Sequence, residues 1–266
     1  TRHCQQEQES YALILRRMPD MLATKYVDTL DRRDLENFRL IMKEEYGVAA
    51  PGINRAVKKL KAAFRWCASE DMLSTVPWDK YRPLPEPPHG HNCGDFAGFM
   101  QVYSRCNPAL QWLIRTCLAL CLRPGKEVSG LRWRDLDLPH GKAHIWMPKV
   151  SRWKDVIAPG WWVDEARIRG EGKAPEDYVC LTLRGRPWHA SFTTWYDTCR
   201  RVGIKHMPLY TVRHMAASLM LEAGADPAAV AAQLGHASVA TTASFYTHAV
   251  AGAQERAARK IPELHR

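Results

Sequence analysis

The sequence lacks the features of membrane proteins, disulfide-stabilised proteins and nucleotide-driven enzymes. Its longest apolar stretch, around Leu118 to Leu122, is far shorter than the roughly 18 residues of a membrane-spanning helix. Its eight cysteines include no Cys-x-x-Cys pair and no paired framework, which favours free thiols and a cytoplasmic protein. It also contains no phosphate-binding P-loop motif, so it gives no sign of ATP-driven chemistry.

A metal site has little support in the sequence. His89, His91 and Cys93 lie close together, but within a stretch rich in proline and glycine and without a second pair of ligands. Asp135 and Asp137 could serve a metal-dependent nuclease, but they fit a turn that leads into a strand. We therefore expect no metal and no cofactor.

An excess of positive charge is the main compositional feature. Lys and Arg number 38 against 28 Asp and Glu, which gives a formal net charge of +10. A strongly basic protein attracts polyanions, and nucleic acid is the leading candidate. With 46% hydrophobic residues, the chain can also bury an ordinary core.

Helix-breaking residues between Leu84 and Cys93 predict a boundary between two domains. We predict a helical domain at 1–84, a linker at 85–93 and a larger domain at 94–266. In the first domain, apolar spacing predicts helices over Tyr11 to Ala23, Asp34 to Glu45 and Ile53 to Cys67.

The helix predicted at Ile53 to Cys67 carries four basic residues away from its apolar face. These residues could simply form a solvated surface. Together with the net charge, they favour contact with DNA, and the predicted contacts are Arg55, Lys58, Lys59 and Arg65.

The second domain mixes helices with a small sheet. The pattern predicts a buried helix over Pro108 to Leu122. It also predicts two short strands, Ala143 to Met147 and Asp155 to Ile157, joined by a basic connection. Helices are predicted again over Thr211 to Ala223 and from Pro227 to Gly235. The predicted fold class is mainly α (α+β), with a small antiparallel sheet in the second domain.

Three segments of the second domain carry polar residues that belong together chemically. They are Leu122 to Trp133, with Arg123; Tyr210 to His214, with Arg213; and Leu234 to His248, with His236 and Tyr246. In order and separation they resemble the characteristic boxes of the tyrosine recombinase (phage integrase) family. The first domain is similar to the helical core-binding domain of that family, on Phe64 to Ala68 and the following Pro77.

The resemblance implies cleavage of one DNA strand by the hydroxyl of Tyr246. The products would be a 3′-phosphotyrosine and a free 5′-hydroxyl. The guanidinium groups of Arg123 and Arg213 would bind the non-bridging phosphate oxygens, where negative charge develops. His236 would donate a hydrogen bond to the same phosphate.

The resemblance also implies a lysine that protonates the leaving 5′-oxygen, from the turn of the sheet. Lys149 is the first choice, and Lys154 in the same basic segment is the alternative. Glu127 resembles the acidic residue that supports the first arginine, but it lies four positions after Arg123, where three is commoner in the family.

One family residue is replaced in this sequence. Tyr210 stands where the family usually has a histidine that acts as general base, and a tyrosine near neutral pH donates hydrogen bonds but is a weak base. His214 matches a second, more structural histidine of the family, so it is not an obvious replacement.

The resulting prediction is a site-specific DNA recombinase that integrates or excises a mobile element. The resemblance implies a homo-tetramer on two double-stranded DNA sites, in the cytoplasm and associated with the nucleoid. A DNA-bending accessory protein is a further possible partner. Two alternatives stay open: strand relaxation of the type IB topoisomerase kind, and a catalytically silent DNA-binding accessory protein, which the replacement at Tyr210 would favour.

Overall fold

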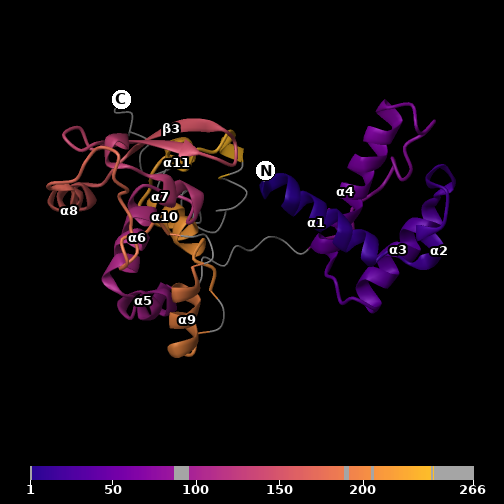
Figure 1. Cartoon of the computed structure of the whole chain (residues 1–266), viewed down its shortest axis with the longest axis horizontal. Coiled ribbons are helices and arrows are strands. Elements are labelled where there is room, and N and C mark those ends of the chain that lie inside the picture. The colour runs from indigo at the N-terminus through magenta and orange to yellow at the C-terminus, as the bar shows by residue number, and fades with distance from the viewer. Residues whose placement is uncertain (1, 87–95, 189–191, 205–206, 241, 243–266) are drawn as a thin grey trace, which may run out of the picture. The chain divides into compact units, whose positions relative to one another are not determined.

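The computed structural model describes residues 2–86, 96–188, 192–204, 207–240 and 242 (Figure 1). The chain divides into two compact units, Thr1–His89 and Gly90–Arg266. The division falls inside the stretch 85–93 that the sequence predicts as a linker. None of the described helices is both long and apolar enough to cross a membrane.

The first unit is helical in its described part. Its elements are α1 (Arg2–Arg16), α2 (Asp20–Ala23), the 3₁₀ helix η1 (Val27–Thr29), α3 (Arg32–Glu44) and α4 (Ala50–Ser69). The single helix predicted over Tyr11 to Ala23 is wrong, because α1 ends at Arg16 and α2 begins only after Pro19. Proline lacks the amide hydrogen that a continuous helix would need at that position.

Local polar contacts fix the start of α3. Asp31 caps α3 by accepting hydrogen bonds from the backbone of Arg33 and Asp34. The indole of Trp78 donates to the carbonyl of Asp31 at 2.8 Å, which ties the segment after α4 to the start of α3. The apolar core of the unit lies between these helices and includes Phe38 and Val57.

The second unit packs helices against one face of a small sheet. Its elements in chain order are α5 (Phe96–Ser104), α6 (Pro108–Ala119), α7 (Lys126–Gly130), the 3₁₀ helix η2 (Trp133–Asp135), β1 (Leu136–Asp137), β2 (Lys142–Met147), β3 (Arg152–Ile157), α8 (Gly160–Gly170), α9 (Thr193–Arg201), α10 (Thr211–Glu222) and α11 (Pro227–Leu234). The predicted fold class is confirmed: the described chain is mainly helical, with one small antiparallel sheet.

The sheet has the order β1-β2-β3, and β2 and β3 form a hairpin in which Trp146 lies opposite Trp153. Side chains alternate across the hairpin, so one face packs inward through Ile145, Lys154 and Val156. The helix α10 packs against α6 and α11, and α11 packs against β3. This arrangement brings the ends of α6, α10 and α11 to the inner face of the hairpin.

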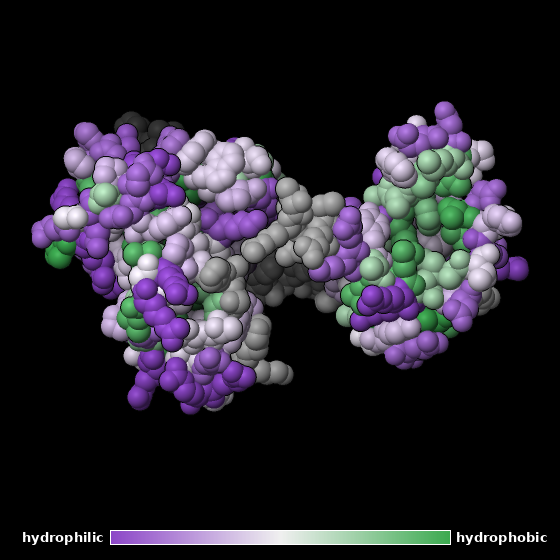
Figure 2. All heavy atoms as spheres, in the orientation of Figure 1, coloured by the Kyte–Doolittle hydropathy of each residue, from purple (hydrophilic) through white to green (hydrophobic). Residues whose placement is uncertain are grey.

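The visible surfaces of the two units differ in character (Figure 2). The second unit is largely hydrophilic in this view, whereas an apolar area is open on the first unit. Exposed large apolar side chains of the first unit include Leu13, Leu40 and Trp66.

Candidate active site

Arg123 and Glu127 form the first part of the site, directly after α6. The carboxylate of Glu127 accepts from the backbone amide of Arg123 at 2.8 Å and from its Nη1 at 2.5 Å. The side chain of Glu127 is 2% exposed and that of Arg123 is 20% exposed. Glu127 therefore contacts Arg123 in spite of the unusual spacing, because the intervening Gly125, at φ 108°, lets the chain turn into α7.

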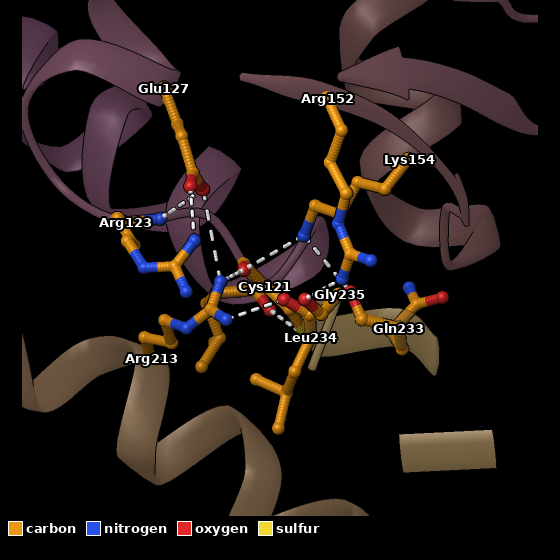
Figure 3. Close-up of polar contacts among 10 residues, drawn as sticks. Cys121, Arg123, Glu127, Arg152, Lys154, Arg213, Gln233, Leu234 and Gly235 are labelled. Carbon is orange, nitrogen blue, oxygen red and sulfur yellow. Dashed lines mark hydrogen bonds and ion pairs between the residues drawn. The ribbon is translucent and has the colours of Figure 1, made fainter. Parts of the chain in front are cut away.

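Arg213 joins this pair from the first turn of α10. Its side chain is 1% exposed, and its Nη1 lies 3.8 Å from a carboxylate oxygen of Glu127. It also donates to the carbonyl of Cys121 and to that of Leu234, each at 2.5 Å. Figure 3 shows the carboxylate of Glu127 directed toward both guanidinium groups.

The two arginines differ in their electrostatic balance. Burial alone would lower the pKa of Arg123, but the hydrogen bond and charge of Glu127, with a contribution from Tyr210, hold it above its ordinary value. Burial and the charge of Arg123 lower the pKa of Arg213. One buried carboxylate thus balances two cations, and the pair keeps a net positive charge that can attract an anion.

His236 follows the end of α11 and is neutral near physiological pH. Burial, followed by the charges of Arg213, Arg123 and Lys154, lowers its pKa to about 4. Its Nδ1 lies 2.8 Å from the hydroxyl of Thr242. If this hydroxyl donates to Nδ1, Nε2 carries the proton and can donate to a phosphate oxygen.

The structure separates the two candidate lysines. Lys149, the first choice from the sequence, lies exposed in the turn between β2 and β3, whereas Lys154 is 8% exposed on the inner face of β3. Lys154 donates to the carbonyls of Cys121 and Gln233, at 3.3 and 3.0 Å. The lysine brought to the arginine pair is therefore Lys154, because side chains of a strand point alternately to its two faces.

Tyr210 and His214 lie side by side at the start of α10. Their rings meet edge to face with centroids 5.0 Å apart, and Tyr210 is 39% exposed. The phenol adds to the positive pKa shift of Arg123, so it lies within electrostatic reach of that guanidinium.

Tyr246 lies outside the described residues, as do His89, His91 and Cys93. The described chain ends four residues before Tyr246, at Thr242, which contacts His236. In the described part of the chain, no group of three or more potential ligands is placed to hold a metal ion.

The sequence reasoning missed Arg152, Gln233 and Thr242. Arg152, in β3, donates to the carbonyl of Gly235 at the end of α11, and Gln233, in α11, accepts from the backbone amide of Ile157 in β3. No local sequence pattern predicts such contacts. The available sign for Thr242 was its place in the sequence: it lies six residues after His236 and four before Tyr246, within one of the three segments that resemble the family.

The four basic residues predicted to contact DNA fall on two sides of α4. Arg55, Lys58 and Arg65 line a groove of about 610 Å³, together with Lys61, which the sequence reasoning did not select. The prediction for Lys59 finds no support in this placement: its Nζ lies 3.5 Å from Glu7 and over the ring of Tyr11. At 100° per residue, positions 58, 61 and 65 share a helix face and position 59 does not.

The comparisons with known proteins agree with this geometry. Residues 100–252 match the model of the Phage integrase family. IntQ of Escherichia coli (strain K12), whose name describes it as defective, is 26% identical in a match that covers 77% of this chain and 63% of IntQ. The chain thus spans less than two thirds of that relative. The tyrosine recombinase XerC of Xanthomonas campestris pv. campestris (strain B100) is 25% identical, over 84% of this chain and 71% of XerC.

Two solved structures show the same fold at low sequence identity. A Tn1549 transposon integrase in complex with a circular intermediate DNA has a TM-score of 0.73 at 19% identity, over 96% of this chain and 94% of that one. A lambda integrase dimer bound to a COC′ core site has a TM-score of 0.70 at 13% identity, over 100% and 92% of the two chains. The family match covers more than half of this sequence, and the chain belongs to the phage integrase family of tyrosine recombinases.

Proposed function

We propose that this protein is a site-specific DNA recombinase that cuts and rejoins DNA strands through a tyrosine–phosphate intermediate. The observation that carries the proposal is the pair Arg123 and Arg213, which share the buried Glu127 beside a neutral His236. In the transition state of phosphoryl transfer, negative charge develops on the phosphate oxygens. A cluster of two guanidinium groups and a histidine is suited to stabilise that charge.

The proposed reaction conserves the number of phosphoester bonds. The oxygen of Tyr246 attacks the phosphorus, a tyrosyl phosphoester forms, and the bond to the 5′-oxygen breaks. The leaving 5′-oxygen takes a proton, and Lys149 is the proposed donor. In the second half, a 5′-hydroxyl of a partner strand attacks the phosphotyrosine and releases Tyr246. Because each step exchanges one ester for another, the reaction needs no external energy source.

The side chains have capacity left for a phosphate. Each guanidinium carries five N–H donors, and Glu127 accepts from one side-chain donor of Arg123 at 2.5 Å. A tyrosine with an ordinary pKa near 10 is a weak nucleophile at neutral pH, so its proton must be lost to a base or in a strong positive field. With Tyr210 in place of a histidine, we propose that the field of the arginine pair promotes ionisation of Tyr246 and that the phenolic proton passes to solvent water.

The test is a covalent adduct on a duplex that contains a 5′-bridging phosphorothiolate at the cleavage point. The thiolate leaves without protonation and cannot easily reattack, so the adduct accumulates. We expect a slowly migrating protein–DNA band on a denaturing gel with the wild type and none with Tyr246→Phe. Absence of the band on a duplex that the protein demonstrably binds would contradict the proposal and favour a silent accessory protein.

A second assay tests the topoisomerase alternative. With two DNA sites, a recombinase produces joined strands of mixed origin, whereas a type IB topoisomerase only relaxes a supercoiled plasmid. The family match favours recombination. We expect recombinant products on a two-site substrate, and relaxation without them would contradict the proposal.

The proposed partners follow from strand exchange between two DNA sites. Two cuts at each of two sites require four active centres, so we propose a homo-tetramer that forms on DNA. A DNA-bending protein could help to assemble it. The proposed place of action is the cytoplasmic nucleoid, and the proposed role is movement of a mobile element.

A further inference from the structure

The carboxyl end of α11 is held by cations from two other elements (Figure 3). Three consecutive carbonyls each accept one hydrogen bond: Gln233 from Lys154 at 3.0 Å, Leu234 from Arg213 at 2.5 Å, and Gly235 from Arg152 at 2.8 Å. The last carbonyls of a helix lack partners within the helix and carry partial negative charge, so cations are favoured there. We call Arg152, Lys154 and Gln233 the latch.

The side chain of Gln233 adds a second connection to the hairpin. Its Oε1 accepts from the backbone amide of Ile157 at 3.1 Å, and its Nε2 donates to the carbonyl of Ile157 at 2.6 Å. The amide side chain therefore pairs with the edge of β3 as a neighbouring strand would. Through the latch, β3 and the end of α11 are joined at several points.

Lys154 also reaches the arginine segment. Its Nζ donates to the carbonyl of Cys121, which also accepts from Arg213. Cys121 lies two residues before Arg123, and Gln233 lies three residues before His236. One ammonium group thus links the backbone on both sides of the site.

The backbone fit at Gly235 shows how close the two elements lie. A Cβ at Gly235 would meet Met147 Sδ at 2.6 Å and Lys154 Cδ at 2.9 Å. The hairpin therefore touches the backbone directly before His236, and a shift of β3 would displace that histidine.

We propose that Lys154, with Arg152 and Gln233, is a positioning residue that holds His236 and Arg213 in register for the phosphate, and that it is not the proton donor. This inference rests on the proposed recombinase function. The buried ammonium of Lys154 directs two of its three N–H groups at backbone carbonyls, whereas Lys149 is exposed in the turn of the same hairpin. Burial, and next the charge of Arg213, lower the pKa of Lys154 to about 8, so the charged form that makes these bonds still prevails at pH 7.

The experiment compares Lys154→Gln with Lys149→Gln on two versions of one duplex, with oxygen or sulfur at the bridging 5′ position. Sulfur leaves without a proton, so it rescues loss of a general acid but does not rescue loss of alignment. We expect Lys149→Gln to cut the oxygen duplex about 100-fold more slowly and the sulfur duplex at nearly the wild-type rate. We expect Lys154→Gln to be about 10-fold slower or more on both duplexes, as for other supporting residues of active sites.

Gln233→Ala serves as the second latch variant. The amide side chain of Gln233 is not an acid, so its removal cannot be confused with loss of the proton donor. The proposal expects equal losses on oxygen and sulfur for this variant too. Rescue of Lys154→Gln by sulfur would identify Lys154 as the acid and overturn the proposal. Wild-type rates on both duplexes for both latch variants would overturn it as well. Failure of the recombinase function itself would look different, since the wild type would then form no adduct on the sulfur duplex.

Discussion

At the scale of single residues, Glu127 controls the charge of the site. Its buried carboxylate lies 2.5 Å from the partly buried guanidinium of Arg123 and 3.8 Å from the buried one of Arg213. A buried ion pair adds little net stability when intact, but removal of one partner leaves an uncompensated charge. Glu127 therefore decides whether Arg123 and Arg213 can remain together in the folded chain.

We predict that Glu127→Gln destabilises the protein by roughly 3 kcal/mol, because the buried Arg213 and the partly buried Arg123 lose their counter-ion. For a unit of this size the melting temperature of its transition should fall by roughly 6–12 °C, measured by differential scanning calorimetry. Glu176→Gln is the matched control: its carboxylate is 60% exposed and pairs with Arg132 and Arg134. That change should stay within about 0.5 kcal/mol. Equal effects of the two substitutions would contradict the role of Glu127.

We predict a pH dependence that comes from His236. Its pKa is about 4 in the folded chain, against 6.5 for an ordinary histidine, so between these values the unfolded chain takes up a proton and the folded chain does not. The free energy of unfolding should therefore fall as the pH decreases from about 6.5 to 4, by roughly 1 kcal/mol or less per pH unit. His236→Asn should lack this contribution. Urea unfolding of both proteins at several pH values checks it, and parallel curves would contradict it.

At the scale of elements, the hairpin β2–β3 and the end of α11 behave as one structural unit. Gly235 ends α11 in the left-handed region, at φ 71°, a common way to terminate a helix. The same glycine leaves room for Met147 and Lys154. Helix termination and hairpin docking thus depend on one residue.

We predict that Gly235→Ala costs about 2–3 kcal/mol, because it combines backbone strain with steric contact against Met147 and Lys154. Gly224→Ala is the matched control, since Gly224 has φ 90° but no heavy atom within 4 Å of the point where a Cβ would lie. It should cost about 1 kcal/mol from strain alone. Calorimetry of the two variants measures the difference in stability. Equal losses of stability would contradict the prediction, because they would show that Met147 and Lys154 can move aside without a measurable cost.

At the scale of the whole molecule, positive charge is distributed over both units. The second unit holds the arginine pair, and the first holds a groove lined by Arg55, Lys58, Lys61 and Arg65. Asp79 lies 3.3 Å from Lys61 and 3.6 Å from Arg65, which neutralises part of this charge. We therefore expect Arg55 and Lys58 to contribute most to DNA binding from this groove.

We predict that Lys58→Ala weakens binding to duplex DNA and lowers the slope of log affinity against log salt by about 1, as for loss of one phosphate contact. Lys59→Ala, on the same helix, should leave the slope unchanged, because Lys59 contacts Glu7 and Tyr11 instead. Fluorescence anisotropy over a range of salt concentrations measures both slopes. The reverse ranking would place the DNA on the opposite side of α4.

The amino-acid sequence by itself determined the fold class, the family and the residue types of the site. These depend on short-range patterns, such as apolar periodicity and compact segments around Arg123, Arg213 and His236, which are readable without a fold. Even there, Pro19 shows the limit, because it divides a segment whose apolar spacing predicts one helix.

Only the tertiary structure decided which lysine lies beside the arginine pair and that Lys59 contacts Glu7 and Tyr11. It also revealed the latch, whose contact between Arg152 and Gly235 joins residues 83 positions apart in the chain. Contacts of this kind form when a helix end and a strand face pack together, and their partners share no sequence pattern. Short local segments thus determine which chemical groups the site contains, whereas the packing of those segments determines how the groups are aligned.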